Sequence, residues 1–262
     1  MSGDGGSRRP FVVLGTQRSG TVLVETLLSS HPDAHCWGEV LLGMDGPTAA
    51  SYPSMLHRRR RLRHLWQMAA SGSALRPGRV IARAYAERPE PRVGIRVMYN
   101  QLRGREERVL AAHDPDVVHV VRENVLRQYV SLQQMRARQA TLGARTAHST
   151  ERIEFDPVVI DPAAVLAFVE SRHRRREEIA RRFSARTVLE LRYERDIEGD
   201  PAYGERAGDL GDLLQDALGL RRVPLTSPLR KTGSRDLARS VSNLDAVRAR
   251  FATTPYAWML ER

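Results

Sequence analysis

The stretch that decides the fold is FVVLGTQRSGTVLVETLL, residues 11–28. Its first five residues form an apolar, β-branched run that ends in glycine, which is typical of a buried parallel strand. Residues 19–30 then place apolar side chains at helical spacing and end at a Ser-Ser-His-Pro-Asp sequence. The stretch therefore predicts a strand, a glycine-rich loop and a helix, which is the arrangement of a phosphate-binding loop.

The loop departs from that of the nucleoside triphosphatases, which reads Gly-x-x-x-x-Gly-Lys-Ser/Thr. Here Thr21 follows Gly20 directly, and the basic residue is Arg18, two places before that glycine. Backbone N–H groups of residues 18–22 at a helix N-terminus are expected to bind an anion. We expect Ser19 and Thr21 to add hydroxyl donors and Arg18 to reach a bridging oxygen of the ligand.

The alternation of strand and helix continues along the chain. Residues 92–99, 116–121 and 187–193 read as further strands with helical segments between them, including 161–183, which has a proline at its start. This predicts an α/β fold: a single doubly wound domain with a central parallel sheet and helices on both faces. Ligands of such sheets bind outside the carboxyl ends of the strands. The segments expected to face one crevice are 15–21, 98–101, 122–124 and 193–194.

The domain organisation follows from length and local composition. The chain has 262 residues, which suits one large domain, here expected over residues 11–262. Residues 1–10 are small, polar and glycine-rich, and we predict a disordered leader instead of a secretion signal. Residues 40–80 and 140–160 interrupt the alternation, and we expect loops and short helices that either shape a substrate pocket or form mobile surface.

The charge balance favours an anionic ligand. The formal net charge is +11, but the arginines are spread along the whole chain. Their densest runs, residues 57–64 and 172–182, lack the interleaved aromatic residues that stack on bases, so we do not expect nucleic acid as a partner. No apolar run approaches the roughly 20 residues needed to span a bilayer.

The single cysteine and the histidines indicate neither a disulfide nor a metal site. Cys36 has no partner for an internal disulfide, which is compatible with a cytoplasmic location. Its surroundings lack a clear base, so a plain thiol is favoured over a nucleophile. The histidines show no metal-ligand spacing, and we predict no metal.

A second motif, residues 117–134 (VVHVVRENVLRQYVSLQQ), places Arg122 at the end of a predicted strand. Ser131 follows nine positions later, inside the next predicted helix. An arginine and a hydroxyl at the same sheet edge as the first loop suit a second phosphate several ångströms from the first. A nucleotide with phosphates at both ends of its ribose would present such a pair.

At this point the sequence resembles the sulfotransferase family. The four segments that carry the resemblance are residues 15–28, 120–131, 189–196 (LELRYERD) and 228–251. They are similar to the family's 5′-phosphosulfate loop, its 3′-phosphate motif, its tyrosine-glutamate strand end and its closing basic loop. Because the loop reads Gln-Arg-Ser-Gly-Thr, the chain looks closest to bacterial carbohydrate and natural-product sulfotransferases.

The resemblance implies a donor and a set of residues that hold it. The donor would be 3′-phosphoadenosine-5′-phosphosulfate, the product adenosine 3′,5′-bisphosphate, and no metal would be needed. Arg18 would contact the 5′-phosphate and its departing oxygen, Arg122 and Ser131 the 3′-phosphate, and Tyr193 would lie near the adenine. The full set of expected donor-binding residues is Gln17, Arg18, Ser19, Gly20, Thr21, Val22, Arg122, Ser131, Tyr193, Lys231, Thr232 and Gly233.

The acceptor hydroxyl needs a general base. Cytosolic relatives place a histidine two residues beyond a basic strand-end residue, whereas here Arg96 fills the basic position and Met98 follows in place of the histidine. Other branches of the family place a glutamate shortly after the first helix, so the resemblance implies Glu39 as the base, with His35 as the alternative. Arg96 either orients the sulfuryl group or forms a structural ion pair.

The leading interpretation is therefore a cytoplasmic sulfotransferase acting on a small-molecule hydroxyl, a sugar or a secondary metabolite. A P-loop kinase or nucleoside triphosphatase is the first alternative, disfavoured by the missing Lys-Ser/Thr pair. A basic nucleic-acid-binding module is the second. The sequence leaves the acceptor and the oligomeric state open.

Overall fold

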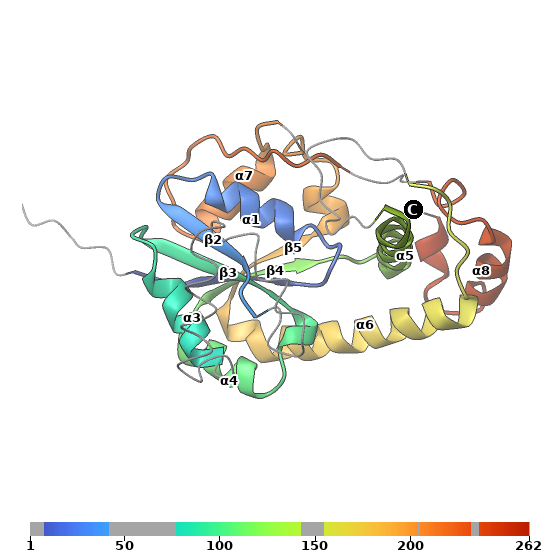
Figure 1. Ribbon diagram of the computed structural model, residues 1–262, viewed down its shortest axis with the longest axis horizontal. Coiled ribbons are helices and arrows are strands. Elements are labelled where there is room, and N and C mark those ends of the chain that lie inside the picture. Colours follow the sequence, from blue (N-terminus) through green and yellow to red (C-terminus); the bar gives the residue numbers. More distant parts are fainter. Residues whose placement is uncertain (1–7, 42–76, 143–154, 204, 232–235, 262) are drawn as a thin grey trace, which may run out of the picture.

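The computed structural model describes residues 8–41, 77–142, 155–203, 205–231 and 236–261. Within them, five parallel strands form one sheet in the order β2-β3-β1-β4-β5 (Figure 1). The strands are β1 (Phe11–Gly15), β2 (Ala34–Glu39), β3 (Arg92–Met98), β4 (Asp116–Val121) and β5 (Thr187–Arg192). The predicted α/β class with a central parallel sheet is confirmed.

Helices cover both faces of this sheet (Figure 1). They are α1 (Thr21–Ser29), α3 (Pro77–Ala86), α4 (Arg105–Ala112), α5 (Val125–Leu142), α6 (Pro162–Phe183), α7 (Asp209–Ala217) and α8 (Leu244–Phe251). Shorter helical turns are η3 (Tyr99–Gln101), η4 (Ser184–Arg186), η5 (Tyr193–Ile197) and η6 (Ala257–Leu260). The helix predicted for residues 161–183 is confirmed as α6, whose N-cap residue Asp161 accepts hydrogen bonds from the N–H groups of Ala163 and Ala164.

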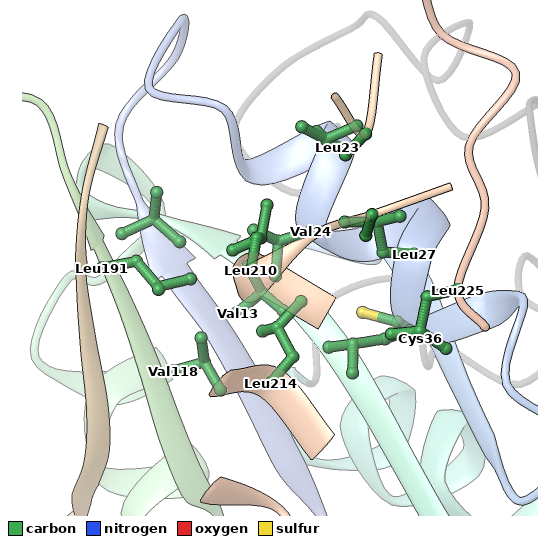
Figure 2. Close-up of a cluster of buried hydrophobic side chains, with 14 of the residues drawn as sticks. Val13, Leu23, Val24, Leu27, Cys36, Val118, Leu191, Leu210, Leu214 and Leu225 are labelled. Atoms are coloured by element: carbon green, nitrogen blue, oxygen red, sulfur yellow. The ribbon is translucent and has the colours of Figure 1, made fainter. Parts of the chain in front are cut away.

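The central strand shows why the sheet is covered on both sides. In β1, Phe11 and Val13 belong to the apolar cluster that includes α1 and α7, and Figure 2 shows Val13 among the leucines of these helices. The alternate residues Val12 and Leu14 belong to the cluster that includes α3, α4 and α6. An apolar strand of this kind has no polar face to present to water, so it requires helices on both sides.

A third apolar cluster joins α5, α6 and α8 beyond the sheet (Figure 1). Phe251 and Met259 are fully buried in it. The carbonyl of Met259 accepts a hydrogen bond of 3.0 Å from the amide of Asn124, in the turn between β4 and α5. The C-terminal segment therefore holds the start of α5, which is one of the elements that form the site.

The strand order has a switch point between β1 and β4. From β1 the chain crosses to β2 at one end of the sheet, and from β4 it crosses to β5 at the other end. The connections that leave β1 and β4 thus run in opposite directions, which separates the loops above these neighbouring strands. The loops after β1 and β4 are those that the sequence assigns to anion binding.

Candidate active site

The loop between β1 and α1 turns in the left-handed region of the backbone. Arg18 has φ 64° and Gly20 has φ 91°. A Cβ atom at position 20 would lie 3.1 Å from a ring carbon of Tyr193, so the close approach as well as the positive φ favours glycine here. The N-cap residue of α1 is Gly20, which has no side chain to cap the helix, so within the described part of the chain the first N–H groups of α1 can receive an anion.

Residues of β4 and α5 hold this loop in place. Gln128 of α5 is buried and donates hydrogen bonds to the hydroxyl of Thr16, at 2.6 Å, and to the carbonyl of Gln17. Arg122, just after β4, donates from Nη1 to the carbonyl of Arg18 at 2.7 Å. The two motifs that the sequence analysis joined across a hundred residues are therefore in direct contact.

The loop hydroxyls are turned inward. Ser19 is fully buried, and its hydroxyl donates to the carbonyl of Thr16 at 2.7 Å. Thr21 is also buried, and its methyl group lies against Gly15. The hydroxyl of Ser19 would have to exchange its present bond to donate to a ligand, and the Ser19 N–H also bonds the Thr16 carbonyl, at 3.3 Å. The N–H groups at the start of α1 are therefore the donors more readily available to an anion.

Three side chains form what we call the arginine cluster: Arg18, Arg122 and Ser131. The Nε of Arg18 donates to the hydroxyl of Ser131 at 2.9 Å. Burial lowers the pKa of the Arg18 guanidinium, and the neighbouring charge of Arg122 lowers it further. Two guanidinium groups thus lie close enough to repel each other at the carboxyl ends of β1 and β4, which is an arrangement that an anionic ligand stabilises.

Residues after β5 complete the surroundings of Arg122. Its guanidinium carbon lies 4.5 Å from the centre of the Tyr193 ring. Glu194 accepts hydrogen bonds from the N–H groups of Glu123 and Asn124, at 3.0 and 2.9 Å, and stands 3.9 Å from Nε of Arg122. Among the described residues this buried Nε has no hydrogen-bond acceptor. Glu194 therefore mainly caps the turn after β4. The Nε of Arg122 can still donate a hydrogen bond to a ligand.

Lys231 reaches the same side of the molecule from the C-terminal third of the chain. Its Nζ donates to the carbonyl and to the carboxylate of Glu198, at 3.2 and 3.3 Å. The same carboxylate stands 3.9 Å from Nη1 of Arg127, in the first turn of α5. Lys231 is thereby held beside the start of α5. The predicted donor-binding residues Thr232 and Gly233 lie outside the described residues.

Three residues in or around the arginine cluster were not predicted individually from the sequence: Arg127, Gln128 and Tyr203. Burial raises the pKa of Tyr203, with a contribution from Tyr193, while the charges of Arg122 and Arg18 act in the opposite direction. For Arg127 and Gln128 a signal existed, because they follow the Arg122 motif at helical spacing. Tyr203 had none, since it lies in an irregular segment.

A second group lies at the carboxyl ends of β2 and β3, and we call it the carboxylate cluster: Glu25, Glu39 and Arg96. The Nε of Arg96 is 2.8 Å from a carboxylate oxygen of Glu25, and its Nη2 is 3.4 Å from one of Glu39. The other oxygen of Glu39 accepts a hydrogen bond of 3.0 Å from Gln101. One guanidinium is thus shared by two carboxylates. Of the two roles considered for Arg96 from the sequence, the structure contains the ion pair.

An irregularity in β2 brings Glu39 into this cluster. Trp37 pairs with Ile95, but the next pair is Glu39 with Arg96, so the register shifts by one residue between them. Without the shift, strict alternation would place Glu39 on the same face as Trp37 and His35. With it, Glu39 lies beside Arg96 and Glu25 on the face covered by α1.

His35 is placed elsewhere. It pairs with Val93, towards the amino end of the sheet. Its ring packs edge-on against Trp37 at 4.5 Å. Burial lowers the pKa of His35, and the charge of Arg88 lowers it further. The structure therefore brings Glu39, and not His35, together with Arg96.

The carboxylate cluster carries an excess of negative charge. Burial raises the pKa of Glu25, Arg96 lowers it, and Glu39 raises it again. The thiol of Cys36 is fully buried, and burial together with Glu25 holds its pKa well above the usual value. Such a thiol is a poor nucleophile, which agrees with the plain thiol that the sequence favours.

Among the described residues, no helix has the length and apolar character needed to cross a membrane. Within the same ranges, no group of three or more histidine, cysteine, aspartate or glutamate side chains is arranged to hold a metal ion.

The chain was compared with known protein families. The family model described as the sulfotransferase family matches residues 10–202, which include β1 to β5 and both clusters. No curated protein matches the chain.

Proposed function

Because the chain belongs to the sulfotransferase family, we propose that it transfers a sulfuryl group from 3′-phosphoadenosine-5′-phosphosulfate to a hydroxyl of a small molecule. The observation that carries this proposal is the contact between the two anion-binding motifs, in which Arg122 bonds the Arg18 carbonyl and Arg18 bonds Ser131. A ligand with an anionic group at each end of one ribose would engage both motifs at once.

The residues present fit this donor. The N-terminus of α1 has no side-chain cap, and Gly20 keeps its backbone accessible where a side chain would meet Tyr193. Arg18 and residues 19–22 would hold the phosphosulfate, and the buried Nε of Arg122 would find in the 3′-phosphate the acceptor that it lacks among the described residues. Tyr193 would lie near the adenine, and Lys231, Thr232 and Gly233 on the 3′-phosphate side.

The donor, when bound, supplies the sulfuryl group and leaves as adenosine 3′,5′-bisphosphate. The protein's part in such a transfer is positioning and charge stabilisation, as in phosphoryl transfer. Arg18 neutralises the negative charge that develops on the departing phosphate oxygen. Glu39 accepts the proton of the acceptor hydroxyl as the acceptor oxygen bonds to sulfur.

The acceptor class follows from the family resemblance and not from the described geometry. We propose a sugar or a secondary metabolite. Residues 40–80 and 140–160 are the proposed acceptor pocket, and of these residues 42–76 and 143–154 lie outside the described part of the chain.

Thermal unfolding with ligands tests the proposal without knowledge of the acceptor. A ligand at about a hundred times its Kd adds roughly 2.7 kcal/mol to the free energy of unfolding. For a protein of this size that corresponds to a rise in Tm of about 5–10 °C. We expect this rise with adenosine 3′,5′-bisphosphate and a much smaller one with adenosine 5′-monophosphate, which lacks the second phosphate.

The other ligands decide between the alternatives. ATP with magnesium is expected to raise Tm less than the bisphosphate does. If ATP with magnesium stabilises and the bisphosphate does not, the donor assignment fails and a P-loop kinase takes its place. Tight binding of DNA or RNA with a steep salt dependence, together with no effect of the bisphosphate, would instead indicate a nucleic-acid-binding module.

A further inference from the structure

Glu25 is the member of the carboxylate cluster to which the proposed reaction gives no part. It lies on α1, in the turn after the phosphate-binding loop, and its carboxylate is closer to Arg96 than that of Glu39, at 2.8 against 3.4 Å. The side chains of Glu25, Arg96 and Glu39 are only 14, 13 and 16% exposed. Little solvent is therefore available to screen their charges.

The two carboxylates differ in how they are held. Glu39 has a second partner in Gln101, which donates from its amide at 3.0 Å. Gln101 is itself fixed, because its amide oxygen accepts the backbone N–H of Met98 at 2.8 Å. For Glu25, Arg96 is the only ion-pair partner among the described residues. Glu39 can therefore lose its ion pair and stay in place, while Glu25 depends on Arg96.

One guanidinium carries one positive charge and cannot fully neutralise two carboxylates. With both carboxylates ionised, the cluster has a net charge of −1; after one proton is added, it has none. The cluster also acts on the thiol of Cys36, whose pKa is raised by burial and, to a smaller extent, by the negative charge of Glu25. Proton uptake by the cluster is therefore electrostatically favoured.

The identity of the group left ionised matters for the reaction. If Glu25 were absent, a proton on Glu39 would leave Arg96 buried without an ionised partner in the cluster, and a buried charge without a counter-ion is strongly unfavourable. With Glu25 present, Arg96 keeps an ionised partner at 2.8 Å when Glu39 becomes neutral. The charges of Glu25 and Arg96 thus cancel each other, and Arg96 remains paired when Glu39 is protonated.

We propose that Glu25 is a positioning residue: it holds Arg96 as its own counter-ion and so enables Glu39 to take up the proton of the acceptor. This inference rests on the proposed function, in which Glu39 is the base. In the balanced step, the acceptor oxygen forms a bond to sulfur and the bond from sulfur to the phosphate oxygen breaks. The acceptor proton moves to Glu39, the departing oxygen keeps the electron pair, and Arg96 stays paired with Glu25.

The test is an NMR titration of the glutamate carboxyl signals of the full-length protein without donor. The Glu39 signal is the one that disappears in Glu39→Gln. In Glu25→Gln, Arg96 should pair with Glu39 alone, so we expect Glu39 to titrate about one pH unit or more below its wild-type midpoint. Arg96→Gln should move the Glu39 midpoint upward, because it leaves two neighbouring carboxylates without a cation.

The matched control is Asp116→Asn. Asp116 is a buried carboxylate of the same sheet, paired with Arg92 at 2.6 Å, but it stands at the amino edge. It should leave the Glu39 midpoint unchanged. If Glu25→Gln does not fold, Glu25→Asp and Arg96→Gln decide, and they should move the midpoint in opposite directions.

An unchanged or raised Glu39 midpoint in Glu25→Gln would overturn the inference, as would movement in the same direction for the substitutions at positions 25 and 96. The titration uses no donor. A failure of the bisphosphate to stabilise the protein would remove the donor assignment, whereas an unmoved Glu39 titration removes only the role of Glu25.

Discussion

The arginine cluster and the carboxylate cluster stand at the same edge of one sheet and have opposite charge balance. Above β1 and β4, the described contacts of Arg18 and Arg122 include a hydroxyl, a carbonyl and an aromatic ring, and the carboxylate of Glu194 stands 3.9 Å from Arg122. Above β2 and β3, one guanidinium faces two carboxylates. The arginine cluster therefore carries positive charge that can bind an anionic ligand. The carboxylate cluster carries negative charge that can bind a proton.

The amino edge of the sheet shows what a purely structural ion cluster looks like. There Asp116 pairs with Arg92 at 2.6 Å and with Arg9 at 2.9 Å. The surplus positive charge sits on Arg9, whose side chain is 61% exposed and is therefore solvated. At the carboxyl edge the surplus charge of each cluster is held by largely buried groups, which is costly unless a ligand or a proton compensates for it.

The largest effect is expected from removing the proton acceptor of the carboxylate cluster. Glu39→Gln should lower turnover on the order of 10²- to 10⁴-fold, the usual contribution of a general base. Bisphosphate affinity should stay within about twofold, because Glu39 lies outside the arginine cluster. The measurement is transfer from labelled donor into a metabolite extract, with Glu87→Gln as the control for losing a surface carboxylate. Unchanged turnover would redirect the search for the base to the residues not described, 42–76 above all.

The next largest effect is expected from the arginine cluster. Arg18→Ala should lower turnover on the order of 10²- to 10³-fold, because it removes a positive group from the oxygen on which charge develops. The fold should persist, which circular dichroism would show. Arg221→Ala, which removes a surface arginine paired with Asp33 at 2.7 Å, is the matched control. Near-normal turnover in Arg18→Ala would remove Arg18 from the mechanism.

A smaller effect, on binding instead of rate, is expected at the other end of the same cluster. Arg122→Ala should weaken adenosine 3′,5′-bisphosphate roughly 10- to 100-fold, the loss of charge-assisted hydrogen bonds to one phosphate. Its affinity for adenosine 5′-monophosphate should change much less. Isothermal titration with both ligands checks this difference. Equal losses for the two nucleotides would mean that Arg122 acts on the loop carbonyl of Arg18 and not on a second phosphate.

The sequence was informative where one residue pattern determines one structure. Apolar runs predicted β1, β3, β4 and β5, and in a parallel sheet their carboxyl ends must share one edge, so the contact between the Arg18 and Arg122 motifs could be anticipated. The sequence also placed Arg122 and Ser131 at this edge, and in the structure each of them bonds Arg18. In both cases the signal lies within a short stretch of chain.

The carboxylate cluster could be predicted only in part. β2 reads AHCWGE, which is neither an apolar run nor a clean alternation, so no strand was predicted there. The register shift that turns Glu39 towards Arg96 arises from the pairing of β2 with β3, so the sequence of β2 alone does not predict it. Glu25 looks like an ordinary polar position of an amphipathic helix until α1 is packed on the sheet. Sites assembled by such long-range pairing need the fold before they can be recognised.

The smallest expected effect concerns the stability cost of the carboxylate cluster. Because burial raises the pKa of Glu25 above its unfolded value near 4.5, the folded state binds this proton more tightly than the unfolded state does. The stabilisation is present below about pH 4.5 and is lost as pH rises through the folded pKa. The Glu25→Gln variant has no titrating carboxylate at position 25, and its Arg96 keeps the ion pair with Glu39. The Tm of the variant relative to wild type should therefore increase from pH 4.5 to pH 7.5. Glu87→Gln, an exposed change, should give only a small difference at both values. A relative Tm that falls with pH would contradict a raised pKa of Glu25 in the folded state.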